Sequence, residues 1–306
     1  MKVDDTGRCR CGGGVSAEPK TSLNHPATGT SVVLLHGAWH SSLHWGPVRT
    51  VLARHGLTSH ALEMPGHGLD APYPSGYLLP GQPGLTTERS GLADLTPDVV
   101  VKDLLGQLAD IRRRTARLVL VAHSAGGGPA SAVLEQEPGL VDHVVYLSAF
   151  VPAGRPRFTD YIGAPENAHA THAPRIGDPD RIGAMRINPL SHDPAEVEAI
   201  RTSFLHDWPA GRPAWRSLLQ PDETTAILSD PFAVTAGRWG TVPRSYVRLT
   251  DDRALPVATQ DLMIAEADRA APGRGFEVHS LPGGHSPFLT RPDELGGLLA
   301  DLATRR

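Results

Sequence analysis

The sequence predicts an α/β domain in which a mostly parallel sheet is covered by helices on both faces. Short apolar runs alternate along the chain with stretches whose apolar residues recur at helical spacing, which is typical of such sheets. The run Leu118-Val119-Leu120-Val121 leads straight into a serine and three glycines, a pattern of strand, abrupt turn and helix. The 306 residues suit one α/β domain that carries an insertion.

Six apolar runs are the predicted strands. They cover residues 32–35, 57–62, 118–121, 144–147, 245–249 and 276–279. Between the first two runs we expect a helix that ends at Gly56, because apolar residues from Trp45 to Leu52 fall on one face. Residues 70–97 are rich in Pro, Gly, Ser and Thr and predict a long loop, after which Pro97 opens a helix. A final helix is expected over residues 292–303.

The composition changes after Val151, where prolines become frequent. Short amphipathic pieces lie between them, as in residues 194–204 and 214–219. This pattern predicts an inserted cap of short helices and loops over residues 152–232. Residues 31–151 and 233–306 then form the core, and residues 1–30 form a disordered tail.

Composition and charge narrow the class of function. A net charge of −4 provides no basic surface for nucleic acid, and no apolar run approaches the ~20 residues of a bilayer helix. Residues 1–30 carry no apolar signal-peptide core, so we expect a cytoplasmic protein. The two cysteines, Cys9 and Cys11, both lie in the tail and lack the partners of a zinc site. We therefore expect neither a structural metal site, a disulfide scaffold nor a thiol nucleophile.

The segment Ala122-His123-Ser124-Ala125-Gly126 predicts a serine nucleophile. A strand–turn–helix junction lifts the serine hydroxyl above the end of a sheet, where a base can take its proton. The tight backbone requires small residues two places before and two places after the serine. The motif has glycine at both places, and Ala122 departs from it by one methyl group.

Two further residues complete a predicted catalytic triad. His285 lies on a glycine-rich loop directly after an expected strand, and Asp252 also lies just past a strand. The chain order of serine, acid and histidine is that of elbow-type hydrolases, and all three positions fall at the edge where α/β sheets bind ligands. Asp251 competes with Asp252 for the role of the acid, and it could instead cap the turn.

The remaining candidates concern the oxyanion and the substrate. Backbone N–H groups of Ala38 and Ala125 are the expected oxyanion donors. Aromatic and histidine side chains are expected to bind substrate: Trp39, His36, Phe150 and Trp208. Other histidines have structural interpretations: His67 lies in a turn, His123 packs away from the site, and the four-residue spacing of His36, His40 and His44 falls in a glycine turn without a nearby acid.

The chain resembles the α/β-hydrolase fold in five motifs. They are His36-Gly37-Ala38-Trp39 with Trp45, the serine elbow, Tyr146-Leu147-Ser148-Ala149-Phe150, the segment from Thr250 to Pro256, and Gly284-His285-Ser286-Pro287. Within that fold the motifs are similar to the branch that holds plant methylesterases and hydroxynitrile lyases, with bacterial esterase relatives. The resemblance covers about residues 31–299. It implies a cofactor-free serine hydrolase with Ser124 as nucleophile, His285 as base, Asp252 as acid and an apolar acyl pocket under the cap.

One departure bears on the chemistry. In the lyases a lysine follows the catalytic histidine, whereas Ser286 stands there in this chain, which disfavours lyase chemistry. Our main hypothesis is therefore hydrolysis of a small apolar or aromatic ester, thioester or lactone. Two alternatives stay open: a tailoring enzyme of secondary metabolism that performs acyl transfer, cyclisation or lyase chemistry, and a non-catalytic ligand-binding module. The oligomeric state is also open, with a homodimer as one option.

Overall fold

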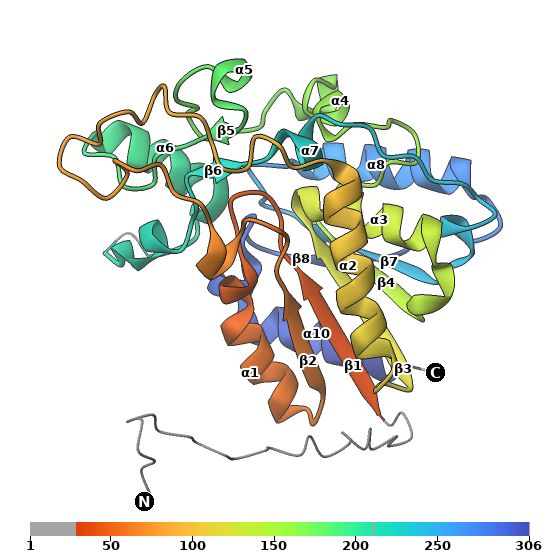
Figure 1. Ribbon diagram of the computed structural model, residues 1–306. Coiled ribbons are helices and arrows are strands. Elements are labelled where there is room, and N and C mark those ends of the chain that lie inside the picture. Colours follow the sequence, from red (N-terminus) through yellow and green to blue (C-terminus); the bar gives the residue numbers. More distant parts are fainter. Residues whose placement is uncertain (1–28, 210, 306) are drawn as a thin grey trace, which may run out of the picture.

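A six-stranded parallel sheet forms the centre of the protein (Figure 1). The computed structural model describes residues 29–209 and 211–305. The strand order is β2-β1-β3-β4-β7-β8. The strands are β1 (Thr30–Leu35), β2 (Thr58–Leu62), β3 (Arg117–His123), β4 (His143–Leu147), β7 (Arg244–Leu249) and β8 (Glu277–Leu281). Leu35 pairs with both Leu62 and Ala122, so the loops that follow neighbouring strands emerge at the same edge.

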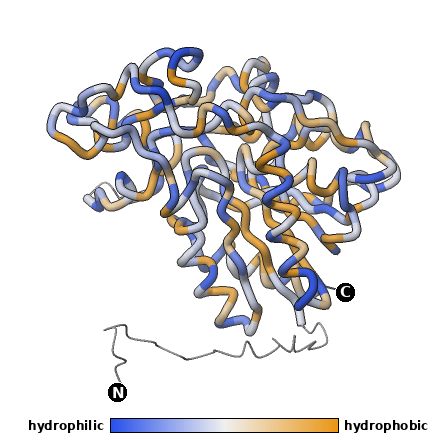
Figure 2. Tube along the Cα trace, viewed as in Figure 1, coloured by the Kyte–Doolittle hydropathy of each residue, from blue (hydrophilic) through white to orange (hydrophobic). Residues whose placement is uncertain are grey.

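Helices cover both faces of this sheet. Helices α1 (Gly46–Arg54) and α10 (Pro292–Thr304) pack on one face, and α2 (Pro97–Arg112), α3 (Gly127–Gln136) and α8 (Val257–Ala270) pack on the other. Alternate residues of each strand point to opposite faces, as Val32 and Val33 do, and build two apolar cores. Figure 2 shows the hydrophobic residues gathered along the strands.

Local sequence explains where the helices begin and end. In α2 the Thr96 side chain accepts a hydrogen bond from the Val99 N–H, and Pro97 occupies the first turn, where no backbone donor is needed. Gly56 has a φ of +73°, a left-handed conformation that suits glycine and ends the α1 segment. Both boundaries agree with the sequence-based prediction.

Residues 152–232, called the cap segment below, connect β4 to β7 and lie above the sheet in Figure 1. They contain α4 (Phe158–Ile162), α5 (Pro179–Ile182), α6 (Pro194–Leu205) and α7 (Thr225–Leu228), and an antiparallel pair of β5 (Met185–Arg186) and β6 (Asp222–Glu223). Apolar side chains of the cap segment, such as Ile187 and Phe204, join the same core as α2, α3 and α8. The cap segment thus shares an apolar core with the helices on one face of the sheet.

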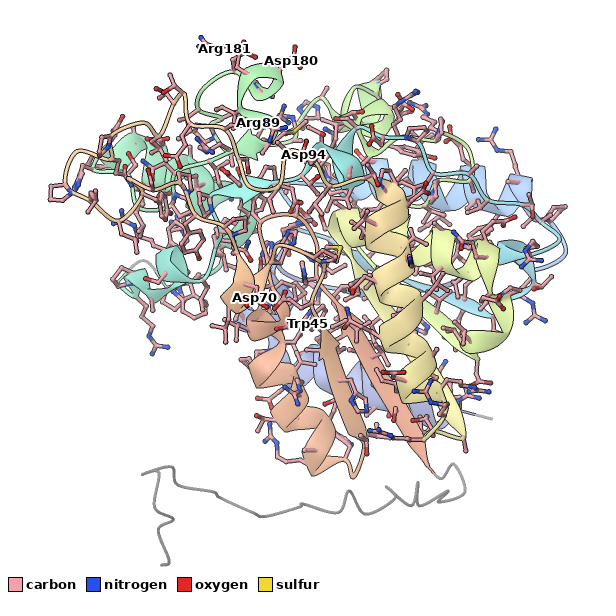
Figure 3. All side chains as sticks on the ribbon, viewed as in Figure 1. Trp45, Asp70, Arg89, Asp94, Asp180 and Arg181 are labelled. Carbon is pink, nitrogen blue, oxygen red and sulfur yellow. The ribbon has the colours of Figure 1, made fainter. Side chains whose placement is uncertain are left out.

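Residues 71–96 form the expected long loop, and the loop packs against the cap segment. The Arg186 guanidinium donates to the carbonyls of Leu85 and Glu88 at 2.6 and 3.1 Å, and it forms a buried ion pair with Asp222. The Ser90 N–H donates to the Ile182 carbonyl at 2.8 Å. In Figure 3, Arg89 and Asp94 of this loop lie beside Asp180 and Arg181 of α5. The loop and the cap segment therefore form one layer.

All six predicted strands are confirmed, and each strand end lies within two residues of its predicted position. Strands β5 and β6 were not predicted, because two-residue strands leave no alternating pattern. The tail prediction and its cysteines, Cys9 and Cys11, fall outside the described residues. Within residues 29–209 and 211–305, no helix is both long and apolar enough to cross a bilayer.

Candidate active site

Ser124 lies in the sharp turn between β3 and α3, with a φ of +51°. Such a φ is strained for a serine and is typical of residues held at functional sites. A Cβ on Gly126 would lie 2.3 Å from the His36 carbonyl oxygen, and one on Gly37 would lie 2.5 Å from the Ser124 Cβ. These contacts explain why glycine is needed there. The extra methyl of Ala122, in contrast, is buried in the apolar core.

The structure brings Ser124, His285 and Asp252 into one chain of hydrogen bonds. The Ser124 hydroxyl lies 3.0 Å from His285 Nε2, and His285 Nδ1 lies 2.7 Å from Asp252 Oδ2. The other carboxylate oxygen of Asp252 accepts from the N–H groups of Ala254 and Leu255 at 2.9 and 2.8 Å. All three side chains are buried. A carboxylate held in this way orients the imidazole and can stabilise its protonated form.

Ser148 is a member of this network that the sequence analysis did not single out as a site residue. Its hydroxyl donates to Asp252 Oδ2 at 2.7 Å, from the turn that directly follows β4. The sequence feature that could have indicated Ser148 is its position at the carboxyl end of a predicted strand, next to the strand that leads into Ser124. Asp251, the rival for the role of the acid, instead accepts from the Gly283 N–H at 2.9 Å and so holds the loop that carries His285.

Three further histidines surround the site in uncharged form. His123 Nε2 donates to the His285 carbonyl at 2.8 Å and so supports the histidine loop, while its ring packs on Phe288. Burial, reinforced by neighbouring imidazoles, lowers the pKa of His40 and His123 well below the ordinary value. Burial lowers the pKa of His44 to about 3. These rings therefore add no positive charge near Ser124 at neutral pH.

The two predicted oxyanion donors are both neighbours of Ser124, one across the cavity wall and one along the chain. Ala38 lines the cavity above the serine, and among the hydrogen bonds of the described residues its N–H donates none. Ala125 is buried in the turn that leads into α3. The first N–H groups of a helix have no partner within the helix and are suited to binding a negative charge.

A narrow cavity of about 60 Å³ opens onto Ser124 and His285. Most of its walls are apolar, and they come from residues 36–39 (called the oxyanion loop below), the cap segment and the turn after β7: Ala38, Trp39, Phe158, Ile162, Ala173, Met185, Phe204, Leu228, Ala254 and Leu255. The polar members other than the triad are Thr159, Thr171, His172 and Arg175. His172 and Arg175 are exposed to solvent. The cavity thus combines apolar walls with a polar outer part.

Of the four predicted substrate-binding residues, only Trp39 lines this cavity. His36, the first residue of the oxyanion loop, is buried, and its Nε2 lies 3.0 Å from Glu63. Phe150 packs behind Phe158, with ring centroids 5.5 Å apart. Trp208 lines a separate open depression on the cap segment. The prediction is corrected for these three residues, because it located them along the chain without knowing which way their side chains point.

Comparisons with known proteins agree with this fold. The model of the α/β hydrolase family matches residues 32–296. A pyrethroid hydrolase of Sphingobium wenxiniae is 28% identical over 285 residues, which are 90% of this chain and 88% of that protein. Methylesterase 7 of Arabidopsis thaliana is 24% identical, over 89% and 96% of the two chains. This chain spans only 56% of a longer chloroplastic methylesterase relative from the same plant.

The protein belongs to the α/β hydrolase family. The crystal structure of a pyrethroid hydrolase from Sphingobium faniae matches with a TM-score of 0.60 and 25% identity, over 90% of this chain and 97% of that one. The fold predicted from the sequence is therefore confirmed, as is its resemblance to the methylesterase branch. The expected class of enzyme, a carboxylic ester hydrolase, also agrees with these relatives.

Proposed function

We propose that the protein is a serine esterase that cleaves small apolar or aromatic esters through an acyl-enzyme. The observation that carries the proposal is the hydrogen-bonded chain from Asp252 through His285 to Ser124, which lines a cavity. A nucleophile, its base and an acid that orients the base form the arrangement needed for acyl transfer. The esterase relatives support the same reaction class.

In the proposed mechanism, the Ser124 oxygen attacks the ester carbonyl while His285 Nε2 takes the hydroxyl proton. The carbonyl oxygen becomes negatively charged and accepts hydrogen bonds from the N–H groups of Ala38 and Ala125. His285 then gives its proton to the departing alkoxide, which leaves as an alcohol. Water attacks the acyl-enzyme by the same route in reverse and releases the acid, so that His285 ends as it began.

The cavity supports a short or flat acyl group. The volume that the centre of a water-sized sphere can reach is small, about 60 Å³, and side chains such as Phe204, Leu228 and Leu255 line it with apolar surface. Burial of an apolar acyl group against these walls contributes about 25 cal/mol per Å² of area removed from water. We expect esters, thioesters or lactones of this kind to be turned over faster than esters of long-chain acids.

The position after the catalytic histidine favours hydrolysis over lyase chemistry. Ser286 is buried, and its hydroxyl donates to His40 Nε2 at 3.0 Å. Burial keeps the pKa of His40 low, so neither group offers a positive charge to a departing anion. This pair replaces the charged lysine that stands after the histidine in the lyases.

The test compares Ser124→Ala with wild-type protein on a series of p-nitrophenyl esters of increasing acyl length. We expect kcat to fall by at least about 10⁴-fold, because the nucleophile is lost while binding remains. Labelling by a fluorophosphonate probe should disappear as well. Ser217→Ala, an exposed position outside the cavity, is the matched control and should behave as wild type. Unchanged turnover in Ser124→Ala would exclude the assignment.

A further inference from the structure

Trp39, the residue that follows the predicted oxyanion donor Ala38, is bonded to the cap segment at three points. Its N–H donates to Glu223 Oε2 at 2.8 Å, and its carbonyl accepts from the Gln220 N–H at 3.0 Å. Its indole N–H donates to the Met185 carbonyl at 3.0 Å. Trp39 also has a φ of +57°, a left-handed conformation that is strained for a bulky residue. Such a conformation persists only where surrounding contacts enforce it.

The Glu223 carboxylate, which accepts from the Trp39 N–H, is fully buried. Glu223 lies on β6 with 0% of its surface exposed, and three donors surround it: the Trp39 N–H, the Thr224 N–H at 2.7 Å, and His67 Nε2 at 3.1 Å. His67 is 1% exposed, and its Nδ1 lies 3.1 Å from the Pro65 carbonyl. Both nitrogens of His67 thus face acceptors, which suits an imidazolium that balances the Glu223 charge.

The electrostatics of His67 agree with this arrangement. Burial alone lowers the pKa of His67, but the charge of Glu223 and its hydrogen bond oppose burial and leave the pKa raised overall. His67 was expected to be an ordinary turn residue. It is instead the buried partner of a carboxylate that lies 156 residues further along the chain.

Glu223 accepts from the peptide group that joins Ala38 to Trp39. This group directly follows the peptide group that carries the predicted oxyanion donor, the Ala38 N–H. The Ala38 carbonyl and the Trp39 N–H belong to one planar unit, so its orientation is set at both ends. His40 Nδ1 donates to the Ala38 carbonyl at 2.7 Å, and Glu223 accepts from the Trp39 N–H. The preceding Gly37 carbonyl accepts from His36 Nδ1 at 3.0 Å. With both flanking groups fixed, the Ala38 N–H keeps one direction.

We propose that Glu223, paired with His67, is a positioning residue that sets the oxyanion loop from the cap segment. The carboxylate aims the Trp39 N–H away from the cavity and thereby leaves the Ala38 N–H directed into it. This inference rests on the proposed function, because it assigns Ala38 as an oxyanion donor. It adds that a correctly seated cap segment is required for the donor to be in place.

The kinetic test uses Glu223→Gln, which keeps the size of the side chain but removes its charge and weakens the hold on Trp39. Loss of an oxyanion donor costs about 10²–10³-fold in kcat, and a misdirected donor costs less. We expect kcat to fall about 10- to 100-fold with KM changed by less than about threefold. Inhibition by a trifluoromethyl ketone, whose adduct places an oxyanion in the same spot, should weaken in proportion to kcat.

Asp222→Asn is the matched control, because Asp222 lies on the same short strand but pairs with Arg186, and within the described residues its carboxylate has no hydrogen bond to the oxyanion loop. We expect this variant to lower the melting temperature at least as much as Glu223→Gln while lowering kcat less. Equal losses of kcat in the two variants would reduce the role of Glu223 to general support of the cap segment and overturn the proposal.

A second measurement does not depend on activity. The chain has five tryptophans, so protein labelled with nitrogen-15 tryptophan gives few backbone amide signals, and Trp39→Phe assigns the one of interest. We expect hydrogen exchange of the Trp39 amide to be at least about tenfold faster in Glu223→Gln than in wild type. Unchanged exchange would overturn the positioning role even if esterase activity is found. Conversely, wild-type turnover in Ser124→Ala would remove the proposed function and leave the Trp39 contact intact.

Discussion

The sheet and the cap segment are stabilised by different kinds of contact. The central strands bury continuous apolar residues, such as Val33, Val119 and Leu120, on both faces. The cap segment also contributes apolar residues, but its contacts, both internal and with the rest of the chain, include buried charges. Arg186 pairs with Asp222, and Glu223 pairs with His67. The reacting groups therefore emerge from an apolar framework, while the layer above them is fixed by ion pairs.

This difference has consequences for substitutions. Removing apolar atoms from a sheet costs free energy in proportion to the area and volume lost. Removing one member of a buried ion pair leaves an uncompensated charge, which costs more than the pair itself contributes. We therefore expect graded effects in the sheet and abrupt effects in the cap segment. The abrupt effects should be reversible when both partners are replaced together.

The largest expected effect lies on the sheet side, in the acid of the triad. Asp252→Asn should lower kcat by about 10⁴-fold, because the amide favours the wrong tautomer of His285. Steady-state kinetics on a p-nitrophenyl ester measures it. Asp251→Asn is the control and should lower kcat by less than about tenfold, since Asp251 accepts from the Gly283 N–H on the histidine loop and from the Thr250 hydroxyl. If the two variants exchanged these effects, Asp251 would be the acid.

The next prediction compares the cap segment with the sheet. The quantity compared is the free energy of unfolding, measured by urea denaturation. Arg186→Ala should lower it by about 3–5 kcal/mol, because Asp222 stays buried without its partner. The double variant Arg186→Met with Asp222→Leu should recover much of that loss. Leu120→Ala in the sheet should cost about 2–5 kcal/mol.

The three variants should also differ in protease sensitivity. Arg186 holds the carbonyls of Leu85 and Glu88, so Arg186→Ala should speed limited proteolysis within residues 71–96. Leu120→Ala should leave that loop as resistant as in wild type under native conditions.

The stability of the double variant decides whether the two regions differ as expected. A double variant that is no more stable than Arg186→Ala would contradict the expected difference between the regions.

The same difference explains what could be predicted from the sequence. The strands and the elbow depend on local patterns, in which an apolar run is followed at once by glycine or a turn residue. Ser124, Asp252 and His285 could be found because each follows such a run. Parallel strands then bring their carboxyl ends to one edge without further information.

The buried charges of the cap segment could not be predicted in this way. Arg186 and Asp222 are 36 residues apart, and neither lies in a recognisable motif. Glu223 and His67 look like ordinary surface and turn residues, because charged side chains are normally exposed. The cap-segment side chains that line the cavity could not be predicted from the sequence, for a related reason. Short helices of the cap segment carry too few residues to show which of their side chains, such as Phe158 or Leu228, point toward Ser124.

The smallest expected effect concerns the pH dependence of the pair between His67 and Glu223. Because the pKa of His67 is raised in the folded state, folding favours the protonated ring. The stability that this ring contributes is fully present below its unfolded pKa of about 6.5, and it is lost as the pH rises through the raised folded value. Glu63 and the ring of His36, 4.7 Å away, are the other groups near His67.

The measurement is the difference in free energy of unfolding between wild type and His67→Gln, followed from pH 6 to pH 9. Wild type should exceed the variant most at the acid end, and the difference should shrink as the pH rises. Other titrating groups, including the buried His40, His44 and His123, are shared by both proteins and cancel in the difference. A difference that stayed constant with pH, or that grew toward pH 9, would mean that His67 is neutral. The Glu223 carboxylate would then be held by backbone and neutral donors alone.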